Sequence, residues 1–152
     1  MKGLFFDADG TLWYVGDEES DGHRHPPTEL VVDPHLTFLL NRLGDMDIPF
    51  WIVSYNDEGV VERAVTYLGL SGRIPPSCIS GGWTPKAERI REIMKIFNLD
   101  RGLFVGDRRG DYMAGVEAGV KAFIIKRKFN KSQLVEGCTI NSLLEILPIL
   151  EN

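Results

Sequence analysis

Two pairs of aspartates stand where short apolar segments of the sequence end. Asp7 begins the pattern D-x-D-G-T, so Asp9 follows it two positions later. Asp107 and Asp111 follow another apolar segment and flank a turn. Carboxylates gathered in one crevice repel one another, and they must either take up protons or share a cation. Oxygen ligands of this kind suit Mg²⁺, so the four residues indicate a magnesium site.

Each aspartate pair also has an interpretation that requires no catalysis. Asp and Gly are common in the turn that follows a strand. Asp111 taken alone could serve as the N-cap of a helix. Neither interpretation explains why four carboxylates come together at strand ends, so we favour the metal site.

Ser54 and Lys86 add two groups that could hold a phosphate. Ser54 ends another apolar segment, and its hydroxyl can donate to a phosphate oxygen. Lys86 stands just inside an expected helix, where the helix dipole disfavours a cation. A nearby anion or carboxylate cluster would offset that cost. Alone, each residue is more often structural, so both gain weight only together with the aspartates.

The elements that must position these residues follow from the apolar periodicity, which alternates between strand-like and helix-like segments. Strands are expected at 4–6, 50–53, 78–79, 103–105 and 122–125, and helices at about 34–43, 60–68, 85–97, 112–118 and 143–147. Asp33 and Pro34 predict the start of the first helix, and Gly44 its end. Such alternation predicts an α/β fold with a mainly parallel sheet, in which ligands bind beyond the carboxyl ends of the strands.

Length, charge and cysteine content restrict the class of protein. The chain has 152 residues, too few for two catalytic domains, and a formal net charge of -5. That charge argues against nonspecific nucleic-acid binding through a basic surface. No apolar run reaches the roughly 18–20 residues that span a bilayer, so no membrane partner is expected. Cys78 and Cys138 lack the spacing of a zinc site or a disulfide framework, which favours a reduced, cytoplasmic location.

The motifs taken together resemble the haloacid dehalogenase (HAD) superfamily of phosphohydrolases. They occur in that superfamily's order, with D-x-D-G-T at 7–11, then Ser54, Lys86, and Gly106-Asp107 with Asp111. The resemblance implies one three-layer α/β/α Rossmann-like catalytic domain over residues 1–152. Its mainly parallel five-stranded sheet would have the strand order 3-2-1-4-5. The insertion at about 13–32 is too short for a full cap domain and leaves at most a flap.

The resemblance also implies a role for each residue. Asp7 would be the nucleophile that forms an aspartyl-phosphate, and Asp9 the general acid and base. The carboxylates of Asp7 and Asp107 and the backbone carbonyl of Asp9 would bind Mg²⁺. Asp111 would lie near the ion, directly or through water, and we favour the indirect contact. The catalytic group is Asp7, Asp9, Ser54 and Lys86, and the expected phosphate and substrate contacts are Gly10, Thr11, Ser54, Tyr55, Asn56, Lys86 and Arg108.

Several alternatives remain open on the sequence. Relatives that cleave carbon–halogen bonds lack an acid two residues after the nucleophile, so Asp9 favours phosphoester hydrolysis. A phosphotransferase with the same intermediate, or a non-catalytic phosphate-binding module, would keep the same residues. The expected partner is a phosphorylated small molecule or macromolecule, and a homo-oligomer could close the open site.

Three further features each have more than one interpretation. His23-Arg24-His25 in the flap offers only two imidazoles, so contact with solvent or an anionic substrate is favoured over a zinc site. Trp13, Tyr14 and Trp83 are large aromatics that could line the entrance or simply pack. The basic run 126–128 is interpreted as a solvated edge or an attractor of anions.

Overall fold

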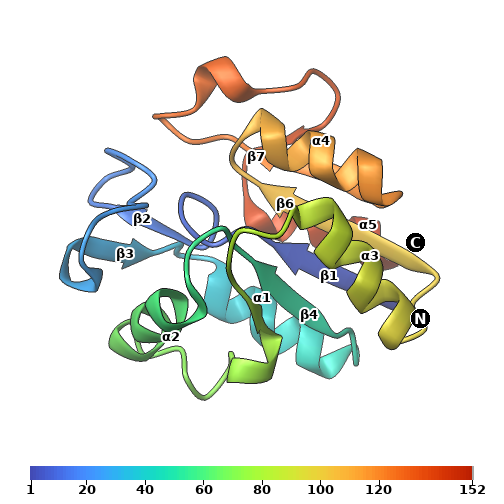
Figure 1. Cartoon of the computed structure of the whole chain (residues 1–152). Coiled ribbons are helices and arrows are strands. Elements are labelled where there is room, and N and C mark those ends of the chain that lie inside the picture. The colour runs from blue at the N-terminus through green and yellow to red at the C-terminus, as the bar shows by residue number, and fades with distance from the viewer. Residues whose placement is uncertain (152) are drawn as a thin grey trace.

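The computed structural model describes residues 1–151, and a six-stranded parallel sheet forms its centre (Figure 1). Its order is β5-β4-β1-β6-β7-β8. Residues at 4–6 are fully buried, as expected for a central parallel strand covered on both faces. The strands are β1 (Lys2–Phe6), β4 (Phe50–Val53), β5 (Ile79–Ser80), β6 (Arg101–Gly106), β7 (Lys121–Ile125) and β8 (Thr139–Ile140).

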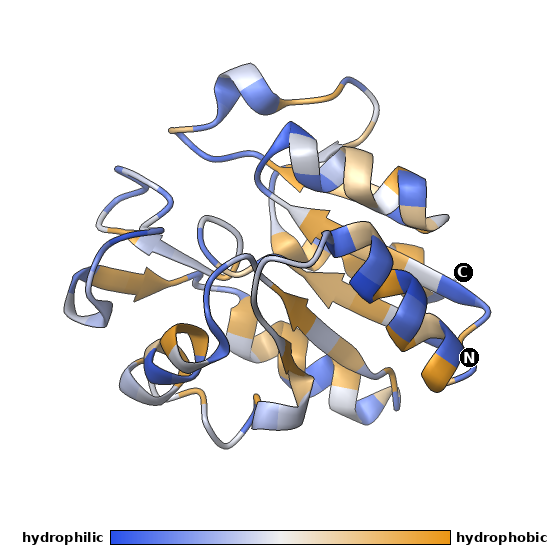
Figure 2. Cartoon of the chain, viewed as in Figure 1, coloured by the Kyte–Doolittle hydropathy of each residue, from blue (hydrophilic) through white to orange (hydrophobic). Residues whose placement is uncertain are grey.

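Helices cover both faces of the sheet and give three layers. One apolar core joins β1 and β4 to α1 (Leu36–Asp45), α2 (Glu58–Tyr67) and α5 (Ile146–Glu151). A second core joins β1 and β6 to α3 (Lys86–Ile96) and α4 (Arg109–Ala118) on the opposite face. Figure 2 shows the strands as mostly hydrophobic in the middle, with hydrophilic residues concentrated on the surrounding helices and loops. Short 3₁₀ turns occupy Pro27–Glu29 (η1), Pro76–Cys78 (η2), Lys131–Gln133 (η3) and Leu143–Glu145 (η4).

The α/β class, the parallel sheet and the order of the five expected strands are confirmed, but the predicted strand count is wrong. The sixth strand, β8, pairs with β7 at the edge of the sheet. It contains only two residues and lacks an apolar run, so periodicity does not reveal it.

Asp33 is not the N-cap of α1, and α4 begins earlier than the sequence predicts. The α1 helix begins at Leu36, and Asp33 precedes it as a buried residue that accepts a hydrogen bond from the His35 N–H at 2.8 Å. The α4 helix begins at Arg109, three residues before the predicted start. The earlier start places Asp111 in the first helical turn, where its side chain accepts from the Arg108 N–H at 3.3 Å.

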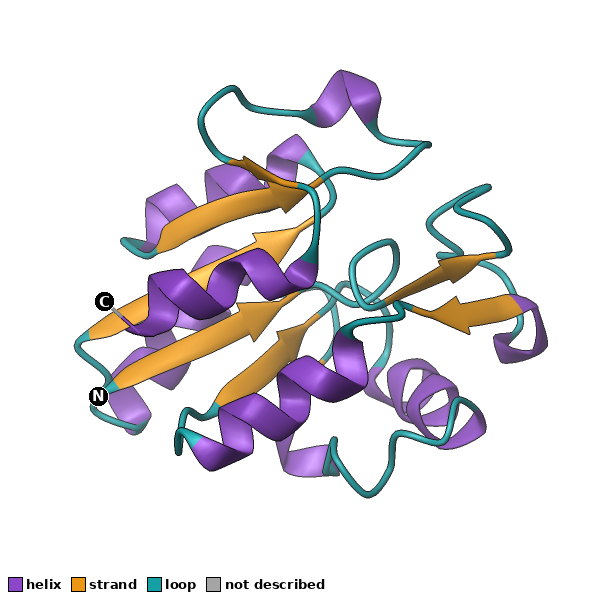
Figure 3. Ribbon diagram, turned by 180° about the vertical axis from the view of Figure 1, so that it is seen from behind, coloured by secondary structure: helices purple, strands orange, loops and turns teal. Residues whose placement is uncertain are grey.

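The insertion at 13–32 forms a small antiparallel sheet of β2 (Trp13–Val15) and β3 (Leu30–Val32). Figure 3 shows this hairpin beyond the arrowheads of the main sheet, and we call residues 13–32 the flap. Trp13 is fully buried in the larger core, which anchors the base of the flap.

Within residues 1–151, no helix is long and apolar enough to cross a membrane. Cys78 and Cys138 are both free thiols.

Candidate active site

The sheet brings Asp7, Ser54 and Asp107 to one edge. Each of them directly follows the last residue of its strand, β1, β4 or β6. The strand ends lie side by side, because Phe6 of β1 is in register with Ile52 of β4 and Val105 of β6. Because the strands are parallel and central, their carboxyl ends open on the same side. The edge therefore gathers the three residues from distant parts of the chain, as the sequence predicts.

Lys86 joins this group from the first turn of α3. Its Nζ donates to Asp7 Oδ1 and to Asp111 Oδ1, both at 2.7 Å, and its side chain is only 4% exposed. Burial alone would lower the pKa of Lys86, but the carboxylates of Asp7 and Asp111 raise it well above its usual value. Lys86 therefore stays charged, which explains a lysine at a helix start where the dipole opposes it.

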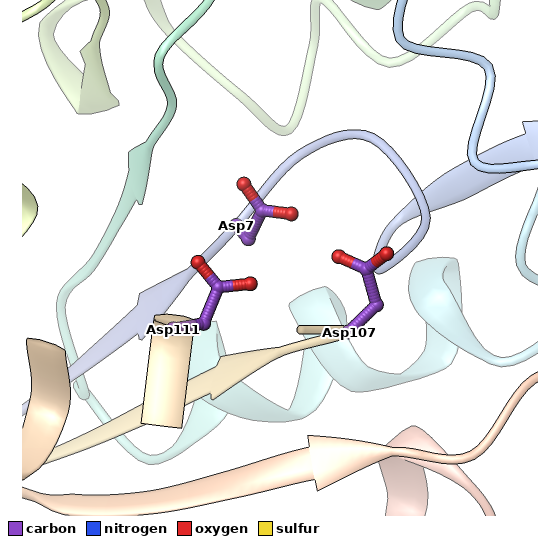
Figure 4. A group of neighbouring side chains, drawn as sticks. All are labelled: Asp7, Asp107 and Asp111. Atoms are coloured by element: carbon purple, nitrogen blue, oxygen red, sulfur yellow. The ribbon is translucent and has the colours of Figure 1, made fainter. Parts of the chain in front are cut away.

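Asp7, Asp107 and Asp111 form a buried acidic cluster (Figure 4). One carboxylate oxygen from each lies within 4.8 Å of the others. Burial and the neighbouring charge of Asp7 raise the pKa of Asp107 to about 10. The same two causes raise the pKa of Asp111 to about 6, although Lys86 opposes the rise. Three crowded oxygen ligands with only one ammonium between them fit a small divalent cation such as Mg²⁺.

The Asp107 carboxyl accepts weaker hydrogen bonds from N–H and O–H donors than the Asp111 carboxyl does. Its hydrogen bond from Thr11 Oγ1 is 3.4 Å long, whereas Asp111 is held by Lys86 and the Arg108 N–H. This difference favours Asp107 over Asp111 as a direct metal ligand.

Replacing Asp107 with Asn is expected to stabilise the metal-free protein. The folded-state pKa of Asp107 lies above its ordinary value. The protonated carboxyl therefore contributes fully to the free energy of unfolding below about pH 4, and this contribution is lost as the pH rises toward 10. At pH 8 in a chelator, Asp107→Asn should therefore raise the free energy of unfolding by at least about 1 kcal/mol. Urea unfolding at pH 5 and pH 8 measures the effect, and an equal or lower stability of the variant at pH 8 would contradict it.

Asp9 lies beside the cluster and is held by the flap and the loop after β4. Trp13 Nε1 donates to Asp9 Oδ1 at 2.9 Å, the Asn56 amide donates to Oδ2, and His23 Nδ1 lies 3.4 Å from Oδ2. Burial first and the charge of Asp7 second raise the pKa of Asp9, while Trp13 and His23 oppose the rise. A carboxyl group that retains its proton more readily is suited to donate it to a leaving group.

Ser54 is buried at the end of β4, and its Oγ accepts a hydrogen bond from the Asn56 N–H at 3.0 Å. The hydroxyl hydrogen remains available to donate into the pocket, which Ser54 lines. Arg89 on α3 fixes this strand end, because it donates to the carbonyls of Ser54 at 2.8 Å and Ser80 at 2.7 Å. The sequence prediction missed Arg89, since an arginine in the second turn of an amphipathic helix carries no distinctive signal.

Solved structures of similar fold cover nearly the whole chain. A D,D-heptose 1,7-bisphosphate phosphatase from B. bronchiseptica, complexed with magnesium and phosphate, has 19% identity and a TM-score of 0.75 over 99% of this chain and 98% of its own. A predicted phosphatase from Clostridium acetobutylicum has 16% identity and a TM-score of 0.76 over 99% of both chains. A haloacid dehalogenase-like hydrolase from Streptococcus pneumoniae has 16% identity and a TM-score of 0.71 over 97% of both chains.

The chain has the haloacid dehalogenase-like fold. At these identities the likeness establishes the fold alone. No protein-family model matches the sequence, and no curated protein matches it either.

In this HAD-like fold a pocket of about 410 Å³ opens over the acidic cluster. Of the expected substrate contacts, Ser54, Tyr55, Lys86 and Arg108 line it. Arg108 is paired with Asp21 of the flap at 2.5 Å. Trp83 also lines the pocket and is 88% exposed, so it stands at the entrance and does not pack in the core. The complete lining is Asp7, Asp9, Asp21, His23, Ser54, Tyr55, Trp83, Lys86, Arg108, Gly110, Asp111 and Gln133.

The other expected contacts lie outside this pocket. Thr11 is fully buried, and its hydroxyl lies 3.5 Å from Asp7 Oδ2 and 3.4 Å from Asp107 Oδ1. Gly10 has a φ of +83°, and a Cβ there would lie 2.2 Å from Asp107 Oδ2, so the turn requires glycine. Asn56 holds Asp9 from a neighbouring pocket. These three residues shape the loop around the carboxylates.

Arg127 is not part of a solvated edge. Its side chain is 5% exposed, and its guanidinium donates to the carbonyls of Gly10 at 3.0 Å and Thr11 at 2.7 Å. It also pairs with buried Asp33 at 2.8 Å and lies over the ring of Tyr14 at 4.6 Å. Arg127 therefore connects the end of β7 to the loop that carries Asp7 and Asp9. The expectation that the run 126–128 is solvent-exposed is wrong for Arg127.

The two imidazoles of the flap have separate partners. His23 faces Asp9, whereas His25 contacts Glu29. Within residues 1–151, the acidic cluster is the one group of three or more metal-ligating residues. Zinc at His23-Arg24-His25 thus gains no further ligand from the described chain.

Proposed function

We propose that the protein is a Mg²⁺-dependent phosphohydrolase that acts on a phosphomonoester through an aspartyl-phosphate at Asp7. The observation that carries the proposal is the position of buried Lys86 between Asp7 and Asp111, with Asp9 beside them at the same strand edge. The B. bronchiseptica phosphatase, which shares the fold, was solved with magnesium and phosphate. Both this likeness and the acidic cluster support the proposal.

The proposed reaction has two steps. In the first, a carboxylate oxygen of Asp7 forms a bond to phosphorus, the ester bond breaks, and Asp9 gives its proton to the leaving oxygen. In the second, Asp9 takes a proton from water as the water oxygen attacks phosphorus, and Asp7 is released with inorganic phosphate. Covalent catalysis of this kind divides one difficult displacement into two easier steps.

Positive charge and donors around the phosphoryl group complete the proposed site. Lys86 and Ser54 would bind the phosphoryl oxygens and stabilise the charge that develops on them. Mg²⁺, held by the carboxylates of Asp7 and Asp107 and by the backbone carbonyl of Asp9, would neutralise the crowded carboxylates and polarise the phosphoryl group. Asp111 would act beside the ion through its bond to Lys86.

The proposal includes the organisation of the protein. Residues 1–152 would form one catalytic domain in which the flap replaces a full cap, and the phosphorylated substrate would reach an open pocket. We propose a cytoplasmic location on the basis of the two unpaired thiols.

Hydrolysis of p-nitrophenyl phosphate tests the proposed activity. Turnover is expected with added Mg²⁺, should fall to background after dialysis against a chelator, and should return when Mg²⁺ is restored. A chelated protein that retains full activity would exclude the magnesium-dependent mechanism. Absence of turnover on this ester and on a broad panel of phosphomonoesters, despite bound Mg²⁺, would favour a non-catalytic phosphate-binding protein.

A further inference from the structure

A second pocket of about 360 Å³ adjoins the first on the side of Asp9, and we call it the side pocket. The two pockets share Asp9 and His23. Flap residues 22–27 form one wall of the side pocket and α2 forms the other. Its apolar lining includes Val60, which is 38% exposed, and Leu30.

The charge of the side pocket is positive at its rim. Arg24 of the flap and Arg63 of α2 both line it, and both are exposed. Within residues 1–151, neither arginine forms an ion pair with a carboxylate. Asp9 is the single carboxylate among the described lining residues, and it is already bound by Trp13 and Asn56. Two exposed arginines without an ion pair among residues 1–151 thus line one pocket of a chain whose net charge is -5.

The position of Asp9 determines which part of a substrate reaches this pocket. The inference rests on the proposed function, in which Asp9 protonates the leaving oxygen. The alcohol part of the ester must then lie on the Asp9 side of the phosphoryl group. The side pocket extends from Asp9 away from the acidic cluster, and we place the alcohol there because neither Asp7 nor Asp111 lines it.

We infer that the side pocket binds the alcohol part of the substrate and that Arg24 and Arg63 bind a second anionic group on it. The apolar surface would contact a short carbon skeleton, and the guanidiniums would bind a carboxylate or a second phosphate through paired hydrogen bonds. The substrate class is therefore a phosphomonoester whose alcohol carries a further negative charge.

Binding to an inactive form tests this inference without requiring turnover. Asp7→Asn protein with Mg²⁺ is titrated by calorimetry with 3-phosphoglycerate and with glycerol 3-phosphate, which have the same carbon skeleton and differ in one carboxylate. We expect at least about tenfold tighter binding of 3-phosphoglycerate. The affinities for propanediol bisphosphate and propanediol monophosphate are compared in the same way to test for binding of a second phosphate. A preference in only one pair identifies which anion is bound.

Arginine variants assign the preference to the side pocket. Arg63→Gln and the double variant Arg24→Gln/Arg63→Gln should reduce the preference for the additional anion by about tenfold or more. Both residues are exposed and lack ion pairs, so melting temperatures should stay near that of the parent protein. Arg91→Gln, at an exposed arginine of α3 whose guanidinium donates to the Glu117 carbonyl, is the control and should keep the preference.

The possible results separate the inference from the function on which it rests. Equal binding of both members of each pair, no binding of any of them, or a preference that survives in the double variant would overturn the assignment of the side pocket. A preference that depends on Arg63, found in a wild-type protein that hydrolyses none of the four compounds, would support the subsite and count against the proposed hydrolysis.

Discussion

Asp7→Asn is expected to lower the kcat for phosphoester hydrolysis by at least about 10⁴-fold. The amide oxygen of asparagine is a poor nucleophile, so the first step of the proposed reaction is lost. Lys86 also loses one of its two carboxylate partners, because Asp7 Oδ1 accepts its hydrogen bond at 2.7 Å. The loss should appear in kcat under saturating substrate, with the fold retained by circular dichroism.

Two controls make this result specific to the nucleophile. Asp45→Asn changes an exposed aspartate of α1 in the same way, and its kcat should match that of the wild type. Acid quenching of the wild type during turnover of a radiolabelled ester should leave acid-stable, hydroxylamine-labile label on the protein, and Asp7→Asn should leave none. More than about a tenth of wild-type kcat in Asp7→Asn, or label that persists in it, would rule out Asp7 as the nucleophile.

The parts of the site that the sequence predicts are those fixed by the parallel sheet. Asp7, Ser54 and Asp107 follow apolar strands, and parallel strands necessarily end at one edge. Lys86 is predictable because its placement at a helix start is unfavourable unless carboxylates are near, and two carboxylates bind it. The local sequence pattern and the rule that parallel strands end at one edge are enough to predict where these residues lie.

The residues that the sequence misjudges depend on contacts between distant segments. Thr11 belongs to the D-x-D-G-T pattern, yet the tight turn at Gly10 directs its hydroxyl into the protein between Asp7 and Asp107. Arg127 stands between two lysines, and nothing in that run shows that its partner is Asp33. Burial of a charged side chain requires such a partner, and the partner is visible only once the chain is folded.

Arg127→Gln is expected to lower the free energy of unfolding by about 3–5 kcal/mol. The substitution leaves the Asp33 carboxylate, 3% exposed, without its 2.8 Å ion pair, and it removes donors from two loop carbonyls. For a domain of this size the melting temperature should fall on the order of 10 °C. Arg109→Gln is the matched control, because Arg109 donates to the Leu134 carbonyl at an exposed position and should cost far less.

A double-mutant cycle identifies the source of the loss. Arg127→Gln/Asp33→Asn removes both buried charges, so it should recover part of the stability lost in Arg127→Gln. Additive effects of the two substitutions would show that the ion pair does not account for the cost.

The same contacts link Arg127 to the magnesium site, and a conservative variant separates this link from global stability. Arg127→Lys keeps a positive charge near Asp33. A single ammonium, however, cannot donate to Gly10, Thr11 and Asp33 at the same time, as the planar guanidinium does. The loop between Asp7 and Asp107 should then be held less firmly, and Mg²⁺ should bind about tenfold more weakly by calorimetry at a temperature where the variant is fully folded. Unchanged Mg²⁺ affinity in a folded Arg127→Lys protein would restrict Arg127 to a purely structural role. It would show that the loop between Asp7 and Asp107 keeps its shape without the guanidinium.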